Sequence, residues 1–337
     1  MNANLDDVGC PVDAPLRPAP AARAAHARFW LGGSRTGVDL SLALPDACVD
    51  ELDAALARLP TLADGEQPGD TTLDADVRAA LARTAAFAGE VRERLEHGAG
   101  AAIVDRFPAE RWNDADNRRV AGIFSELVAP LEPQAFDGTK LYDVMDKKVR
   151  DVGAVRRSVT NLAQAYHTDG PWVKVPARYI GLYCIRSAGQ GGDSRVTSLL
   201  CAADALRAGA DGADGEALFA ELERAQPWDR QGEHAPGDTP WEAHPIFAES
   251  EEGVVARFYE SYVRRGHELA GRSMSPLADA ALAGLGSALE AQPAVRFLME
   301  PGQFQYANNY TVAHARDAFE DDPEAPGGRR LVRVWHR

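Results

Sequence analysis

The segment Ala165-Tyr166-His167-Thr168-Asp169-Gly170 places the strongest constraint on how this chain folds and on what it binds. In a β-strand, residues i and i+2 project from the same face, so His167 and Asp169 can bind one cation together. Gly170 and Pro171 then end the strand, which places the pair at an open mouth. Taken alone, a His-x-Asp tripeptide favours a surface histidine beside a solvated carboxylate, so a metal site needs further ligands.

A second histidine, His314, lies in another strand-like run, residues 308–316. Two histidines and one carboxylate form the facial triad of non-heme Fe(II) oxygenases, which leaves coordination positions free for substrate and O₂. His167 and His314 are far apart in the sequence, so such a site requires a fold that brings distant strands together. A core histidine that donates to a backbone carbonyl would give the same pattern.

A basic cluster follows the second histidine in the segment Gly327-Gly328-Arg329-Arg330-Leu331-Val332-Arg333. The planar guanidinium group of arginine can make two parallel hydrogen bonds to a carboxylate. The cluster therefore indicates an anionic partner. A solvated edge of the chain, continued by Arg337, is the alternative interpretation.

The composition limits the classes of function. The 36 basic and 51 acidic side chains leave a net charge of −15, and 45% of the 337 residues are hydrophobic, as in an ordinary globular protein. An acidic surface repels phosphate backbones and anionic membranes, so we expect neither a nucleic-acid nor a membrane partner. No apolar run is long enough for a transmembrane helix, and no signal peptide is evident, so we expect a cytoplasmic protein.

The four cysteines are scattered and include no C-x-x-C pair, which argues against a disulfide framework or a thiolate zinc site. Cys184 lies in the apolar run 179–185, and we expect it to be a small buried residue.

The first part of the chain reads as a leader followed by helices. Residues 1–27 are rich in Pro and Ala and predict a flexible leader. Apolar residues at spacings of three and four then predict helices over 46–59, 72–97 and 110–131, with a short apolar strand over 100–108.

Short strands dominate from about residue 141 onward. They are predicted over 165–169, 177–185, 193–199, 254–259, 304–308, 312–316 and 331–335. A helical, acidic insertion at about 202–240 and a helix over 276–291 interrupt them. Helices followed by many short strands predict an α+β, mainly β fold, with a sandwich or barrel core buttressed by helices.

Four motifs, taken in their order along the chain, resemble those of the TauD/TfdA superfamily of Fe(II)- and 2-oxoglutarate-dependent dioxygenases. The chain looks most similar to the clavaminate-synthase-like branch of this superfamily. The motifs cover roughly residues 100–337 and comprise His167-x-Asp169, Gly191-Gly192-Asp193-Ser194, Pro301-Gly302 before Asn308-Asn309 and His314-Ala-Arg316, and Arg329-x-x-x-Arg333. The resemblance implies one oxygenase domain over 28–337. A helical buttress at about 40–131, a double-stranded β-helix (jelly-roll) core at about 141–337 and a helical lid insertion at about 202–240 would make up this domain.

The resemblance also assigns residues to roles. His167, Asp169 and His314 would bind the iron. Ser194 stands where the family commonly has Thr and keeps a hydroxyl that can donate to the 2-oxoglutarate carboxylate. Arg329 would hold the distal carboxylate, and Arg333 resembles the second arginine of the pattern.

Arg330 is the residue that could be confused with Arg329. Strand alternation turns it to the opposite face, but a slip of one residue would exchange the two roles.

The implied reaction uses Fe(II), 2-oxoglutarate and O₂. It converts 2-oxoglutarate to succinate and CO₂ and hydroxylates an unactivated C–H bond of a small, amino-acid-derived substrate. Desaturation or ring closure by the same chemistry is the first alternative. A zinc hydrolase with the same His₂-carboxylate ligands and a non-catalytic metal-binding protein are further alternatives. The sequence leaves the oligomeric state open.

Four further residues are candidate substrate contacts, each with a structural alternative. Trp172 could cover the substrate or anchor its loop in the core. Asn161 and Gln164 precede the ligand strand and could instead make turn hydrogen bonds. Asn308 could orient the site or cap neighbouring backbone. His244 is expected to be a packed loop residue.

Overall fold

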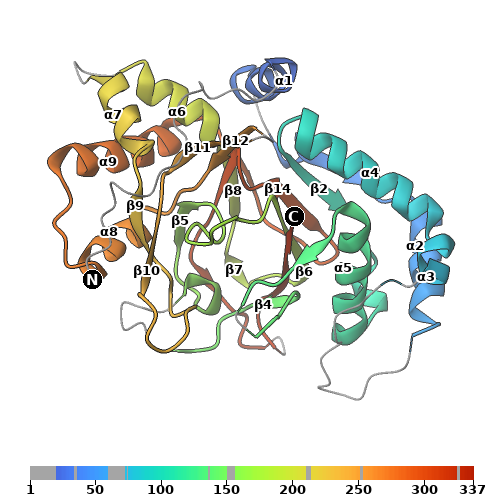
Figure 1. The fold of residues 1–337 in the computed structure, drawn as a ribbon. Helices are drawn as coiled ribbons and strands as arrows, with labels where there is room; N and C mark the ends of the chain where they lie inside the picture. Colours follow the sequence, from blue (N-terminus) through green and yellow to red (C-terminus); the bar gives the residue numbers. More distant parts are fainter. Residues whose placement is uncertain are drawn as a thin grey trace.

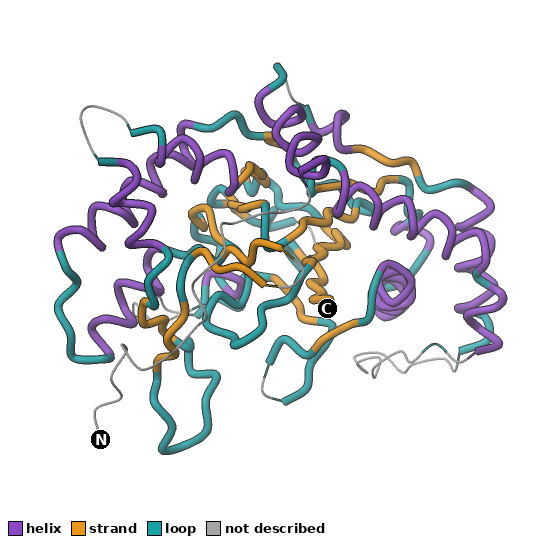
Figure 2. The backbone as a smooth tube through the Cα atoms, turned by 45° about the horizontal axis from the view of Figure 1, so that its top comes forward, coloured by secondary structure: helices purple, strands orange, loops and turns teal. Residues whose placement is uncertain are grey.

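Two β-sheets stand between two groups of helices in this protein (Figures 1 and 2). The computed structural model describes residues 20–33, 36–59, 73, 75–135, 137–149, 156–209, 214–250, 253–324 and 327–337. Within these residues, the helices of the first third of the chain lie on one flank of the sheets and the later helices lie on the other (Figure 1).

The larger sheet has seven strands and contains the final strand of the chain. Its order is β1 (Ser41–Ala43), β2 (Ala101–Asp105), β14 (Phe304–Asn308), β6 (Tyr179–Arg186), β17 (Arg330–His336) and β3 (Leu131–Glu132), and β4 (Tyr142–Val144) also pairs with β17. β6 lies between β14 and β17 and is antiparallel to both. The predicted strand over 304–308 has the observed bounds, whereas β17 is one residue longer at each end than predicted.

The smaller sheet carries both candidate histidines. Its order is β13 (Val295–Phe297), β8 (Ser194–Ser198), β15 (Val312–Arg316) and β5 (Gln164–His167), and all three pairings are antiparallel. The remaining strands form three antiparallel pairs, namely β7 (Gln190–Gly191) with β16 (Phe319–Glu320), β9 (Gln226–Asp229) with β10 (Trp241–His244), and β11 (Phe247–Ser250) with β12 (Gly253–Ala256).

The two sheets face each other across a shared apolar core. Ile180 and Ala307 from the larger sheet belong to the same buried cluster as Val196 and Val312 from the smaller one. Packing of two antiparallel sheets through alternate inward side chains is the arrangement expected for a jelly-roll core. The predicted α+β fold with a double-stranded β-helix core is confirmed.

The N-terminal helices cover the outer face of the larger sheet, as the predicted buttress requires. Leu95 of α4 (Ala82–His97) and Phe124 of α5 (Asp114–Val128) share one core cluster with Tyr306 and Val334 of the sheet. α2 (Asp46–Leu56) contributes the buried Leu52 to the same cluster.

The predicted helix over 72–97 is two helices, α3 (Ala75–Ala80) and α4. Leu81 between them has a non-helical backbone and is fully buried. The Glu51 carboxylate accepts hydrogen bonds from the backbone N–H groups of Arg83 and Thr84, so it satisfies donors in the first turn of α4. This side-chain cap from another helix stabilises the break, and the local periodicity does not reveal it.

The helices of the predicted lid insertion pack behind the smaller sheet. Leu206 of α6 (Leu199–Arg207) and Phe219 of α7 (Gly215–Leu222) share a core cluster with Leu285 of α9 (Pro276–Ala291) and with Ala313 of β15. This packing corrects the expectation that these helices cover the site. The part of the insertion that lines the mouth of the site is the loop between β9 and β10, because Arg230 and Glu233 line a cavity beside Trp172.

The predicted leader over 1–27 overlaps a helix. Residues 1–19 lie outside the described residues, but α1 (Pro20–Leu31) begins at residue 20. Its Trp30 is buried and donates from Nε1 to the carbonyl of Ala99 at 2.8 Å, and His26 Nε2 lies 2.7 Å from Ser198 Oγ. The prediction of a leader without regular structure is therefore wrong for residues 20–27, because tertiary contacts hold this helix against the core.

Within the described residues, no helix combines the length and apolar character that crossing a membrane requires.

The docking of α1 can be tested with two adjacent residues. Trp30 is 1% exposed and Leu31 is 63% exposed. We expect Trp30→Ala to lower the free energy of unfolding by about 3–5 kcal/mol, since it empties a buried site, whereas Leu31→Ala should change it by less than about 0.5 kcal/mol. Urea unfolding of the two variants measures both effects, and equal stabilities would show that α1 is not docked.

Candidate active site

Strand pairing brings the two predicted histidine ligands together. His167, the last residue of β5, lies directly opposite His314 of the antiparallel strand β15. Their ring centroids are 4.1 Å apart. Directly opposed residues on one face of a sheet are close enough for both side chains to contact one ion, so the sheet register fixes this half of the site.

Asp169 completes the cluster two residues beyond the end of β5. Its Oδ1 atom lies 3.5 Å from Nε2 of His167 and 3.6 Å from Nε2 of His314. One ligand atom from each of the three residues falls within 4.8 Å of the others, and all three side chains are buried. The predicted metal ligands therefore converge, with two imidazole nitrogens and one carboxylate oxygen facing a common point.

The protonation states suit metal binding. Nδ1 of His167 lies 2.9 Å from the carbonyl oxygen of Ala165. If Nδ1 carries the proton and donates it there, Nε2 has a free lone pair for a metal. Burial, together with the neighbouring His167, lowers the pKa of His314 to about 3, so this ring is neutral at physiological pH.

The outer oxygen of Asp169 is held from the larger sheet. Nε1 of Trp335 donates to Oδ2 at 2.8 Å, and Nη1 of Arg333 lies 3.2 Å from the same atom. Burial alone would raise the pKa of Asp169, but the positive charge of Arg333 is the largest of the effects that oppose it, and together these effects hold this pKa far below its usual range. Asp169 is thus an anion that presents Oδ1 to the two histidines.

The backbone around Asp169 is fixed as well. Gly170 has a φ of +57°, and a Cβ atom there would lie 2.7 Å from the Trp335 ring. The side chain of Asn309 accepts from the Asp169 N–H and donates to the Asp169 carbonyl. Glycine is therefore required at 170 both for the left-handed turn and for the close approach of Trp335.

The cluster fits the iron centre that the sequence predicts. Two imidazoles and one ionised carboxylate are the donor set of facial-triad Fe(II) sites. The outer atoms of His167 and Asp169 have hydrogen-bond partners of the kind that orient metal ligands, whereas the buried Nδ1 of His314 has none among the described residues. His167, Asp169 and His314 would hold the metal.

An inner cavity next to the cluster contains the residues predicted to hold 2-oxoglutarate. Ser194, Arg329 and Arg333 line it together with the three candidate ligands. Arg329 is 4% exposed, and its buried Nη1 has no hydrogen-bond partner among the described residues. Burial lowers the pKa of Arg329 to about 10, which still leaves it charged. A buried cation without a counter-ion is suited to a carboxylate ligand.

The neighbouring arginine has a different environment. Arg330 pairs with Asp143 at 2.9 Å and with Asp114 at 2.6 Å, and it does not line the inner cavity. The observed register therefore turns Arg329, not Arg330, toward the candidate metal centre. Arg333 lines the cavity, but its guanidinium already contacts Asp169 and Gln134.

Arg316 is an inner-cavity residue to which the sequence analysis gave no role. Its Nη2 donates to the carbonyls of Arg157, Thr160 and Leu162 and so fixes the loop that leads into β5. Arg316 and Arg329 both lie about 5 Å from the ring of Phe319. Burial and the charge of Arg329 lower the pKa of Arg316 to about 9. The sequence signal that could have identified Arg316 as a site residue is its position two residues after His314, on the same face of the strand.

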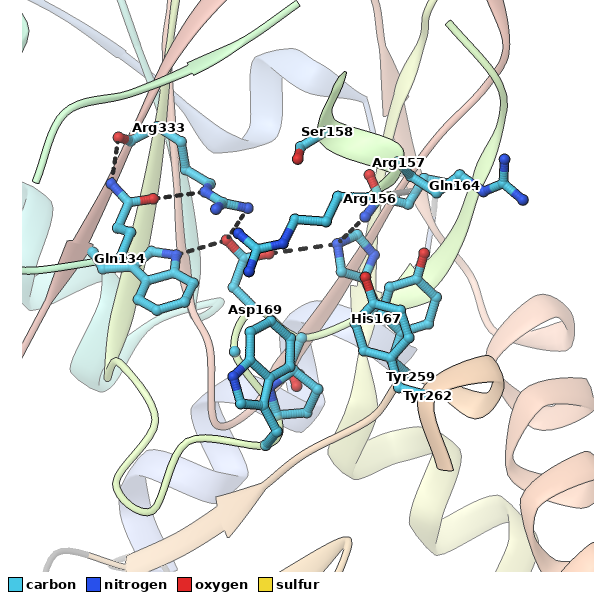
Figure 3. A pocket seen from close by; sticks show the side chains of 15 residues that line it. Gln134, Arg156, Arg157, Ser158, Gln164, His167, Asp169, Tyr259, Tyr262 and Arg333 are labelled. Carbon is cyan, nitrogen blue, oxygen red and sulfur yellow. Dashed lines mark hydrogen bonds and ion pairs between the residues drawn. The ribbon is translucent and has the colours of Figure 1, made fainter. Parts of the chain in front are cut away.

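A second, outer cavity also contains His167 and Asp169 of the cluster (Figure 3). Gln164 and Trp172, two of the four predicted substrate contacts, line it. The Gln164 amide nitrogen is 2.8 Å from Nε2 of His167, the atom that a metal would take, so metal binding would replace this hydrogen bond. Trp172 packs against Tyr262, with 5.7 Å between the ring centroids.

The other two predicted substrate contacts line neither cavity. The Asn161 amide donates to the Phe319 carbonyl. The Asn308 amide donates to the carbonyl of Leu95, and its Oδ1 accepts from the Tyr310 N–H. Both asparagines therefore have their alternative, structural role of satisfying backbone groups.

His244 is likewise packed in its loop, with Nε2 lying 3.1 Å from the Trp172 carbonyl.

Tyr259, Tyr262 and Arg156 are among the outer-cavity residues to which the sequence analysis gave no role. Tyr259 stacks on Tyr262 with centroids 4.0 Å apart, and it also lies 4.9 Å from the ring of His167. Arg156 lies over the Trp172 ring and pairs with Glu233. These side chains come from loops and from the start of α8 (Glu260–Leu269), and no periodic pattern in the sequence marks them.

Comparison with known proteins agrees with this geometry. The family model described as "Taurine catabolism dioxygenase TauD, TfdA family" matches residues 64–335. FR-33289 synthase of Streptomyces rubellomurinus is 24% identical over 276 residues, which cover 80% of this chain and 78% of that protein.

Solved structures with a similar fold include two oxygenases. An asparagine oxygenase in complex with Fe(II), 2S,3S-3-hydroxyasparagine and succinate superposes with a TM-score of 0.61 at 15% identity, covering 88% of this chain and 93% of that one. The non-heme iron oxygenase OrfP, in complex with Fe, succinate and (3R,4R)-dihydroxy-L-Arg, gives a TM-score of 0.64 at 15% identity, with coverages of 88% and 94%. The family match spans most of the chain, including all three candidate metal ligands, and the chain belongs to the TauD/TfdA family.

Proposed function

We propose that this protein is an Fe(II)- and 2-oxoglutarate-dependent dioxygenase that hydroxylates an unactivated C–H bond of a small, amino-acid-derived substrate. The observation that carries the proposal is the pairing of two features in one cavity. A His₂-carboxylate cluster stands beside Arg329, a buried arginine whose Nη1 has no partner among the described residues. The cluster suits iron, and the arginine suits the distal carboxylate of 2-oxoglutarate.

When bound, iron with 2-oxoglutarate and O₂ supplies the oxidising power for the reaction, while 2-oxoglutarate is converted to succinate and CO₂. The protein supplies orientation. Arg333 and Trp335 keep Oδ2 of Asp169 engaged, so that Oδ1 remains directed at the two histidines. Arg329, which directly precedes β17 of the larger sheet, and Ser194 of β8 in the smaller sheet would hold the far end of 2-oxoglutarate.

The outer cavity, which contains His167 and Asp169 of the cluster, would hold the substrate. Tyr259, Tyr262 and Trp172 provide a largely aromatic wall around His167. Such a wall excludes water from the reacting carbon and limits where a substrate C–H bond can lie.

Two oxygenases of similar fold support the proposal of an amino-acid-derived substrate. The structures with a similar fold include an asparagine oxygenase with hydroxyasparagine and an oxygenase with hydroxyarginine. The oxygenase OrfP has also been solved with Fe and alpha-ketoglutaric acid, the same cofactor and cosubstrate that we propose here.

Desaturation or ring closure would use the same iron site, so the product distinguishes these reactions from hydroxylation. A zinc hydrolase or a non-catalytic metal-binding protein is less well supported, because neither has a use for the buried Arg329 beside the cluster.

We further propose that the enzyme works in the cytoplasm. Cys48 and Cys184 are free and buried, as expected of a protein in a reducing compartment.

The activity is tested by succinate formation from 2-oxoglutarate in the presence of Fe(II), ascorbate and O₂. We expect iron-dependent succinate from the wild type, stimulated by the substrate, and its loss in His314→Ala, because one of the three metal ligands is removed. A chelator should abolish the activity and added Fe(II) should restore it. A wild-type protein with no iron- and O₂-dependent succinate formation under any condition contradicts the proposed function.

The 2-oxoglutarate site is tested with the two adjacent arginines. We expect Arg329→Gln to raise the KM for 2-oxoglutarate by about tenfold or more, because a charge-assisted hydrogen bond to a carboxylate is lost. The matched variant Arg330→Gln should leave this KM unchanged and should instead lower stability, since Arg330 pairs with Asp114 and Asp143. The opposite result in steady-state kinetics would move the cosubstrate to Arg330.

A further inference from the structure

The outer cavity is rich in positive charge although the protein is acidic overall. Arg156, Arg157 and Arg333 line it, and Asp169 is the only carboxylate among its described lining residues. Both oxygens of Asp169 are already engaged, Oδ1 by the two histidines and Oδ2 by Arg333 and Trp335. A substrate in this cavity therefore meets guanidinium groups but no available carboxylate.

Arg156 is the cation best placed to meet an anion. Its side chain is one of those that line the cavity in Figure 3. Nη2 pairs with Glu233 at 2.5 Å, and the guanidinium lies 5.8 Å from the centre of the Trp172 ring. The structure gives its Nε and Nη1 no partner among the described residues, so Glu233 and Trp172 hold the group in place with two donors still unused.

Backbone carbonyls of the two loops that flank the metal-ligand strand are also occupied. Arg257 donates to the carbonyls of Pro171, Val173 and Lys174, in the loop that follows the metal-ligand strand. Arg316 does the same for the loop that precedes this strand. These are the acceptors that an ammonium group would otherwise use.

The aromatic wall does not offer a site for an ammonium either. Arg156 already lies over the Trp172 ring, and Tyr259 is stacked between Tyr262 and His167. An ammonium group bound by cation–π contact needs an open ring face. Three carboxylates line the neighbouring cavity, and each is paired: Glu132 with Arg337, Glu233 with Arg156 and Glu242 with Arg230.

We propose that the substrate is an anion without a free ammonium group, namely an amino-acid-derived molecule whose amine is acylated, with its acidic group bound by Arg156. An acyl group removes the positive charge that this cavity cannot accommodate and leaves the negative charge that Arg156 can bind. This inference rests on the proposed function and narrows its substrate class.

The test compares matched pairs of compounds. The probes are the protein L-amino acids, each free and as its Nα-acetyl derivative. Calorimetric binding to the anaerobic Fe(II)–2-oxoglutarate protein and substrate-stimulated succinate formation are both measured. We expect at least one acetylated compound to bind about tenfold or more tightly than its free partner and to stimulate succinate formation.

Three variants connect the preference to Arg156. Arg156→Gln should weaken binding of the preferred acetylated compound by about tenfold to a hundredfold, because the charged donor is lost, and Arg156→Lys should recover part of that loss. The control variant is Arg264→Gln. Arg264 lies on α8 and pairs with Glu260 of the same helix and with Asp279 of α9, so this variant should bind the compound like the wild type.

Any one of three results overturns the inference. The free amino acids bind more tightly than their acetylated partners, no compound binds in either form, or Arg156→Gln binds the preferred compound with unchanged affinity. The same preparations are also assayed for iron-dependent succinate formation without added substrate. If succinate forms, the proposed function stands and only the inference fails. If no succinate forms at all, the proposed function itself fails.

Discussion

The contact between the Asp169 carboxylate and the final strand of the chain is the interaction on which the site depends. One oxygen of this carboxylate faces His167 and His314 from the smaller sheet, and the other is held by Trp335 and Arg333 from the larger sheet. The carboxylate therefore joins the two layers of the jelly roll at its open mouth. Its depressed pKa keeps it ionised at neutral pH, and its contacts with Trp335 and Arg333 orient it before a metal binds.

Buried positive charge distinguishes the interior of this acidic protein from its surface. Arg257, Arg316 and Arg329 are all buried, and the structure gives none of the three a salt bridge to a carboxylate among the described residues. Burying an unpaired ion costs several kcal/mol. Arg257 and Arg316 recover part of this cost from backbone carbonyls and thereby fix the two loops that flank β5. Arg329 has no such compensation for its Nη1, which is why it is the natural anchor for a carboxylate.

The sequence predicted the parts of the structure that depend on local pattern. β14, β15 and α9 have their predicted bounds, and the spacing of His167 and Asp169 pointed to the metal site. We expected His167 and Asp169 to share one face of a single strand, but only His167 belongs to β5. β5 ends at His167, and Asp169 lies in a bend beyond it, where the backbone is held by the hydrogen bonds that Thr168 exchanges with Phe258.

The contributions that were missed come from long-range contacts. Arg156 reaches the outer cavity from a loop, and it is oriented by Glu233 from a distant segment, which no local periodicity encodes. Asn308 has the type and the neighbourhood of a site residue, but the packing of α4 against the larger sheet gives its amide a backbone partner instead. The position of α1 likewise depends on Trp30 meeting Ala99, a contact visible only in the folded chain.

An anaerobic crystal structure with Fe(II) and 2-oxoglutarate tests the central claim most directly. We predict that Asp169 binds the iron through Oδ1 alone, that Oδ2 keeps its hydrogen bond from Trp335, and that the distal carboxylate of 2-oxoglutarate lies on Arg329. Iron bound without Asp169, or an Asp169 that turns both oxygens to the metal and releases Trp335, would contradict the account.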